Sequence, residues 1–138
     1  MKIPRAEADA IAAHARSGYP HEVCGVLVGT ARDGVVRVAR AVGVANRETE
    51  RPAVRYQIAP EDLIGVQRSV RTEGLDIVGY YHSHPDHPAQ ASRFDTERAW
   101  AGYVYLIVAV HEGKPEDANA FVADKDGGPF HPEPLEVA

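Results

Sequence analysis

Residues 75–81 read LDIVGYY and are followed at once by a polar segment, residues 82–95, that reads HSHPDHPAQASRFD. The first segment is short and rich in β-branched and aromatic residues, which predicts a buried strand. Pro85 lacks a backbone donor and opens an irregular stretch, so the strand is expected to end close to this residue. The abrupt change from an apolar to a polar segment predicts a fold that contains a sheet. In this sheet, the polar side chains lie at the end of a buried strand.

His82 and His84 are separated by a single residue. On a strand, this spacing directs both imidazoles to one face of the sheet. Asp95 then supplies a carboxylate as a third ligand. Two neutral imidazoles and one carboxylate make a three-ligand zinc site, whose fourth coordination position stays open for water; this arrangement is typical of catalytic zinc. The sequence therefore predicts one zinc ion per chain, bound by His82, His84 and Asp95.

Ser92 and Asp95 also have a purely structural interpretation. Their spacing is that of a helix N-terminus, with Ser92 as the N-cap and an acidic residue three positions later, near the positive end of the helix dipole. Two histidines near a strand end are likewise compatible with ordinary surface residues. Capping, however, does not account for the histidine pair upstream, and one carboxylate can serve as both cap and ligand. We therefore expect a helix to begin at Ser92 and favour the metal interpretation.

The pattern H-x-H-P-x6-S-x-x-D, together with a glutamate in the upstream context EVCGVLVG, resembles the JAMM (MPN-plus) metalloproteases. The matching residues are Glu22, His82, His84, Pro85, Ser92 and Asp95. The resemblance extends over nearly the whole chain and is strongest to the short bacterial members. It implies an α/β (α+β) fold: a single domain over residues 1–138, with a curved mixed sheet of about six to eight strands flanked by two or three helices.

The resemblance also implies a function: zinc-dependent hydrolysis of the peptide or isopeptide bond that follows the C-terminal Gly-Gly of a ubiquitin-like or sulfur-carrier protein. Glu22 is then the expected general base. Zinc lowers the pKa of its bound water towards about 7, and a nearby carboxylate can take the proton and pass it to the leaving amine. Ser92 is expected to stabilise the oxyanion, with helix capping as its competing role. For Glu22 the alternative is a surface carboxylate at the start of a strand.

Composition sets the broad class. A chain of 138 residues, 44% hydrophobic and 25% charged, is typical of one soluble globular domain. A net charge of -5 argues against nucleic acid or an anionic membrane as a partner. No segment resembles a signal peptide or approaches about 18 consecutive apolar residues, so a cytoplasmic location is expected. The single cysteine excludes four-cysteine zinc sites and an intramolecular disulfide.

Hydrophobic periodicity predicts a mixed order of helices and strands around the central strand. The expected helices cover residues 6–17 and a segment that begins at Pro60 and ends at Gly74. The expected strands cover residues 23–28, 35–44, 54–58, 103–110, 119–123 and 130–137. Gly127 and Gly128 precede Pro129 and are expected to form a turn.

Three alternatives to the zinc peptidase stay open. A thiol mechanism at Cys24 is disfavoured because a cysteine among valines and glycines is usually a small core residue. A non-catalytic binding module on the same scaffold is disfavoured because the motif residues are all retained. A different metalloenzyme, such as an iron(II) oxygenase, also uses two histidines and one carboxylate, although usually at the reverse spacing. His87, in the loop between the ligands, is expected to be solvated.

Overall fold

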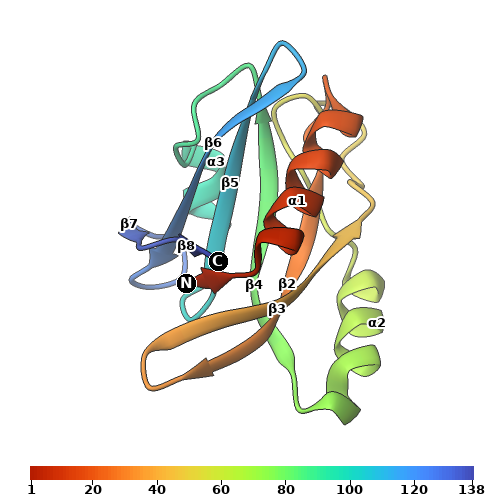
Figure 1. Cartoon of the computed structure of the whole chain (residues 1–138). Helices are drawn as coiled ribbons and strands as arrows, with labels where there is room; N and C mark the ends of the chain where they lie inside the picture. Colours follow the sequence, from red (N-terminus) through yellow and green to blue (C-terminus); the bar gives the residue numbers. More distant parts are fainter.

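The computed structural model describes residues 1–138 as one mixed sheet of eight strands with three α-helices (Figure 1). The elements, in chain order, are β1 (Lys2–Ile3), α1 (Arg5–Gly18), β2 (Cys24–Arg32), β3 (Val35–Val44), α2 (Pro60–Val70), the 3-10 helix η1 (Arg71–Glu73), β4 (Asp76–Pro85), α3 (Arg93–Glu97), β5 (Val104–His111), β6 (Lys114–Ala123), β7 (Phe130–Glu133) and β8 (Glu136–Val137). The strand order is β7-β6-β5-β4-β2-β3-β1-β8. The predicted fold class, strand number and helix number are confirmed.

Strand β4 lies at the centre of the sheet and ends at Pro85, as predicted. It pairs antiparallel with β2 and parallel with β5, so its backbone is hydrogen-bonded on both edges. Tyr81 belongs to the apolar cluster beneath α1, whereas Tyr80 belongs to the cluster beneath α2. Because His82 and His84 follow Tyr80 at intervals of two, they stand on the α2 face of the sheet.

Helices cover both faces of the sheet. In Figure 1, α1 crosses the near face, while the short helix α3 lies behind the sheet. Ile11 and Ala15 of α1 and Val66 and Val70 of α2 are the buried residues of these helices, at the helical spacing that the sequence predicts. Full burial of a side chain such as Ile11 contributes roughly 1.5–3 kcal/mol to stability. No helix of the chain has both the length and the apolar content to cross a bilayer.

The two outermost strands of the sheet, β7 and β8, are neighbours in the sequence. The chain leaves one edge at Glu133 and joins the other edge, beside β1, at Glu136. The single strand predicted over residues 130–137 is therefore wrong. The change of edge occurs at Pro134, which has no backbone N–H for a sheet ladder. The N-terminal ammonium of Met1 donates to Glu133 Oε1 (3.1 Å) and to the Pro134 carbonyl (2.6 Å) at this junction.

The strand predicted over residues 54–58 is also wrong, because this segment is turn and coil within the connection between β3 and α2. The side chain of Asn46 satisfies the backbone there in place of a neighbouring strand. Its Nδ2 donates to the carbonyl of Arg55 (3.0 Å), and its Oδ1 accepts from the N–H of Gln57 (3.0 Å). Asparagine side chains commonly compete with a sheet ladder in this way.

Candidate metal centre

Three ligand atoms converge at the end of β4. His82 Nε2 lies 3.1 Å from His84 Nε2 and 3.2 Å from Asp95 Oδ2, and His84 Nε2 lies 3.0 Å from the same oxygen. All three residues are buried. A tetrahedral ion with bonds of about 2.0–2.1 Å separates its ligand atoms by roughly 3.3 Å. The spacing of the three atoms therefore fits a zinc-sized ion, and the structure brings together the three residues that the sequence singles out.

The two imidazoles are oriented by different means. His84 Nδ1 lies 2.8 Å from the carbonyl of Pro88, which fixes a proton on Nδ1 and leaves the Nε2 lone pair directed at the centre. His82 Nδ1 is buried without a partner. Its ring instead stacks on Tyr56, with centroids 4.5 Å apart and planes at 24°. Packing thus orients one ligand and a hydrogen bond orients the other.

Asp95 combines the two roles expected of it at the start of α3. Its backbone N–H donates to Ser92 Oγ (3.0 Å), and its Oδ2 accepts from the Ser92 N–H (3.0 Å), which is a complete capping box. The same Oδ2 faces the two histidines. The cap therefore fixes the carboxylate in the rotamer that points at the centre.

Electrostatics favour the metal-binding form of two of the three groups, His82 and Asp95. Burial lowers the pKa of His82, so its imidazole is neutral. Burial alone would raise the pKa of Asp95, but hydrogen bonds to His82 and His84 lower it well below its usual range. A deprotonated carboxylate and a neutral imidazole are the forms in which these side chains bind metal.

Glu22 lies beside the centre, just before β2. The residue is 5% exposed, and its carboxylate oxygen Oε1 has no hydrogen-bond partner. Burial raises the pKa of Glu22 to about 8, although the nearby His84 opposes this shift. A divalent cation nearby would favour the charged form. Glu22, His84 and Ser92 share one cleft of about 380 Å³.

The backbone around Glu22 is tied to the histidine strand by Ser83. The N–H of Val23 donates to Ser83 Oγ (2.9 Å), and the Ser83 N–H donates to the Val23 carbonyl (3.1 Å). The connection between β3 and α2 holds the other side: the Glu22 N–H donates to the Pro52 carbonyl (2.7 Å), and Asn46 Nδ2 donates to the Glu22 carbonyl (3.0 Å).

Sequence reasoning missed three supporting residues: Asn46, Tyr56 and Ser83. Ser83 carried a usable signal, because a serine inside a buried strand needs a hydrogen-bond partner. Tyr56 was assigned to a strand that does not form, so its stack on His82 was not foreseen. Asn46 acts on segments 9 and 24 residues away, and nothing in its local sequence indicates these contacts.

Other candidate residues have plain structural roles. Cys24 is buried, and burial raises the pKa of its thiol to about 12, so the thiolate needed for a thiol mechanism does not form near neutral pH. His87 is exposed at the rim of the cleft, as expected. Gly127 and Gly128 have φ values of 88° and 93°, which confirms a turn.

A family model of the prokaryotic homologs of the JAB domain (Prok-JAB) matches residues 4–124. The chain belongs to this family. The resemblance to short bacterial JAMM proteins is thereby confirmed. Among Prok-JAB relatives, the desampylase of Haloferax volcanii is 41% identical over 104 residues, which cover 72% of this chain and 73% of the desampylase. The CysO-cysteine peptidase of Mycobacterium tuberculosis is 34% identical over 91 residues, which cover 66% of this chain and 60% of the peptidase.

Solved structures share the Prok-JAB fold. A solution structure of a Desulfitobacterium hafniense protein has a TM-score of 0.85 at 26% identity, with 100% of this chain and 93% of that chain covered. A JAB1/MPN domain protein from Archaeoglobus fulgidus has a TM-score of 0.60 at 19% identity, with 100% and 96% covered. The eight-stranded sheet and its helices are thus the architecture of JAB/MPN domains.

Proposed function

We propose that this Prok-JAB protein is a zinc peptidase or isopeptidase that hydrolyses the bond after the C-terminal Gly-Gly of a ubiquitin-like or sulfur-carrier protein. One observation carries the proposal: the buried triangle of His82, His84 and Asp95 borders a cleft that also contains Glu22 and Ser92. The names of the desampylase and of the CysO-cysteine peptidase are consistent with bond cleavage at such carriers.

Each residue has a role in the proposed reaction. His82, His84 and Asp95 would hold zinc, which when bound polarises the scissile carbonyl and acidifies water. The carboxylate of Glu22 accepts a proton from the attacking water and then delivers this proton to the leaving amine. Ser92 keeps its hydroxyl proton free, because Ser92 Oγ acts as an acceptor in the capping box, and can donate it to the developing oxyanion.

The state of Glu22 favours a catalyst over an idle binding module. A buried carboxylate oxygen without a partner destabilises the folded protein, and such groups are usually retained where chemistry needs them. A module that only binds would gain stability by replacing this residue. The buried Glu22 is therefore better explained by proton transfer than by structure.

Two measurements test the proposal. The first is metal content by mass spectrometry: one zinc per chain is expected in the purified protein, and strongly reduced zinc in Asp95→Ala. Iron as the bound metal would instead support the oxygenase alternative, and full zinc retention in Asp95→Ala would mean that the third ligand is wrong.

The second measurement is cleavage of a carrier protein that bears a C-terminal extension after its Gly-Gly. We expect cleavage after the second glycine and strongly reduced cleavage when that glycine is replaced by valine. Glycines lack Cβ atoms, so their carbonyl can approach the centre where a larger residue clashes. Equal rates for the two carriers would contradict the proposed specificity.

A further inference from the structure

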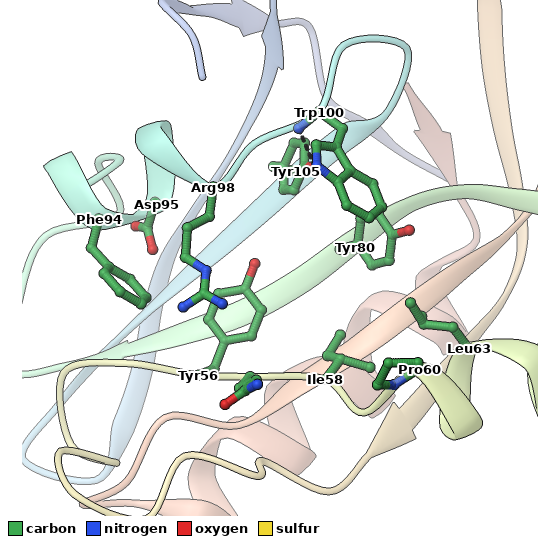
Figure 2. Close-up of a pocket in the computed structure, with 11 residues that line it drawn as sticks. Tyr56, Ile58, Pro60, Leu63, Tyr80, Phe94, Asp95, Arg98, Trp100 and Tyr105 are labelled. Atoms are coloured by element: carbon green, nitrogen blue, oxygen red, sulfur yellow. Dashed lines mark hydrogen bonds between the residues drawn. The ribbon is translucent and has the colours of Figure 1, made fainter. Parts of the chain in front are cut away.

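A second hollow lies on the other side of Asp95 (Figure 2). It is a cavity of about 200 Å³, and five of its 11 lining residues are aromatic: Tyr56, Tyr80, Phe94, Trp100 and Tyr105. In Figure 2, Tyr56 and Leu63 line one side, and Phe94 and Trp100 the other. A cavity of this size accommodates one aliphatic or aromatic side chain, since an engineered cavity of about 150 Å³ binds benzene.

The cavity borders the metal centre. Asp95 lines the cavity and also faces both histidines. Tyr56 lines it and also stacks on His82. A chain bound at the centre therefore has the cavity as a direct neighbour.

The two hollows take different halves of a substrate, an assignment that rests on the proposed function. Glu22 lines the first cleft and must reach the leaving amine, so the leaving group lies on that side. The acyl side of the scissile bond, which is the carrier's own tail, then extends past Asp95 towards the aromatic cavity.

One arginine, Arg98, lines the cavity, and a second, Arg55, lies next to one of its walls. The guanidinium carbons of Arg55 and Arg98 lie 4.7 Å and 4.9 Å from the centroid of the Phe94 ring. Neither arginine forms an ion pair with a carboxylate, whereas Arg47 pairs with Asp62 and Arg93 with Glu97. In Figure 2, Arg98 extends from the end of α3 towards Tyr56. Arg98 thus presents a guanidinium without a carboxylate partner at the cavity, in a chain whose net charge is -5.

We propose that this cavity is a specificity pocket for the carrier's tail, which selects an apolar side chain beside an acidic one. The apolar side chain fills the aromatic cavity. The acidic side chain pairs with Arg98, whose planar guanidinium group suits a carboxylate. Tails with basic residues at the same place are disfavoured by like charge.

The sole tryptophan makes the test independent of catalysis. Trp100 lines the cavity and is 53% exposed, so its fluorescence reports occupancy. The zinc-loaded wild-type protein is titrated with synthetic octapeptides that end in Gly-Gly. In one series, an adjacent Glu and Leu are placed among the third, fourth and fifth residues counted from the C-terminus. In two matched series, Lys replaces the Glu or Ser replaces the Leu.

We expect the best Glu-Leu peptide to bind on the order of tenfold more tightly than its Glu-Ser counterpart, because a leucine side chain is buried. It should bind on the order of fivefold more tightly than the Lys-Leu counterpart, because an exposed pair is worth up to about 1 kcal/mol. Equal affinities across all series would overturn the proposal.

Charge reversal supplies the second arm. Arg98→Glu should reverse the preference, so that Lys-Leu binds better than Glu-Leu. Arg93→Glu is the matched control: it lies on the same helix and makes the same charge change, but Arg93 does not line the cavity and should leave the preference unchanged. An equal effect of both variants would mean that the selectivity comes from the net charge of the protein, and the proposed pocket would be wrong.

The outcomes separate this proposal from the proposed function. Selective peptide binding without cleavage of any extended carrier would support the proposed pocket and contradict the proposed peptidase activity. Cleavage at equal rates whatever residues precede Gly-Gly would support the proposed peptidase activity and contradict the proposed pocket.

Discussion

At the scale of one residue, Glu22 is the position at which the proposed function lowers the stability of the fold. Its buried carboxylate oxygen Oε1 has no hydrogen-bond partner, but its backbone is held on both sides, because its N–H donates to the Pro52 carbonyl and its carbonyl accepts from Asn46 Nδ2. A side-chain replacement of equal shape should therefore leave the local backbone unchanged and alter only the chemistry.

Glu22→Gln is expected to lower turnover by on the order of 10²–10⁴-fold, because that is the typical contribution of a general acid-base group. Zinc content should stay at the wild-type value, since Glu22 is not a ligand. Thermal stability should be equal or higher, because a neutral amide is less costly to bury than a carboxylate. Steady-state kinetics, metal analysis and thermal unfolding check the three expectations; normal turnover would remove Glu22 from the mechanism.

At the scale of elements, the site depends on the registration of β2 and β4. Ser83 sits between the two histidines on the opposite face of β4 and accepts the N–H of Val23, the residue after Glu22. This bond ties the backbone beside Glu22, the proposed base, to the strand of the proposed ligands. We therefore expect Ser83 to be a positioning residue, which acts through Glu22 rather than on the substrate.

Ser83→Ala should leave the buried N–H of Val23 unpaired, at a cost of about 1–3 kcal/mol in the free energy of unfolding. Metal content should persist, while kcat falls and KM changes little, because the base moves relative to the centre. Ser69→Ala is the control: Ser69 Oγ is also hydrogen-bonded to the backbone, as donor to the carbonyl of Val66, but on an exposed face of α2. A wild-type kcat in Ser83→Ala would show that the bond does not position Glu22.

The elements that the sequence predicted are those with local causes. The i, i+2 spacing of His82 and His84 and the cap at Ser92 need only neighbouring residues, and both are confirmed. Residues 54–58 have strand-like composition, yet the side chain of Asn46 forms hydrogen bonds with their backbone in place of a neighbouring strand. Local propensity cannot foresee a competitor 9 residues or more away.

At the scale of the whole molecule, the sheet ends are joined where the chain passes from β7 to β8. Strand β1 has only two residues, which is too short for any periodicity to reveal, and it forms because β3 and β8 flank it. The two edge strands are short, with four residues in β7 and two in β8, which limits the length of unpaired strand edge. The scaffold is therefore expected to be stable independently of the centre, and α3, with five residues, to depend on it.

Metal removal should separate these two parts of the molecule. A ligand that binds only the folded state adds about 2.7 kcal/mol when its free concentration is 100 times Kd, so chelation should lower Tm by on the order of 10 °C. Amide exchange should quicken most in α3 and the loop before it, because Asp95 joins α3 to β4 through the centre, and least in β2, β4 and β5. Asp95→Ala is the control, since chelation should not change its Tm. A uniform increase in exchange across the sheet would mean that the metal supports the whole fold rather than the α3 segment alone.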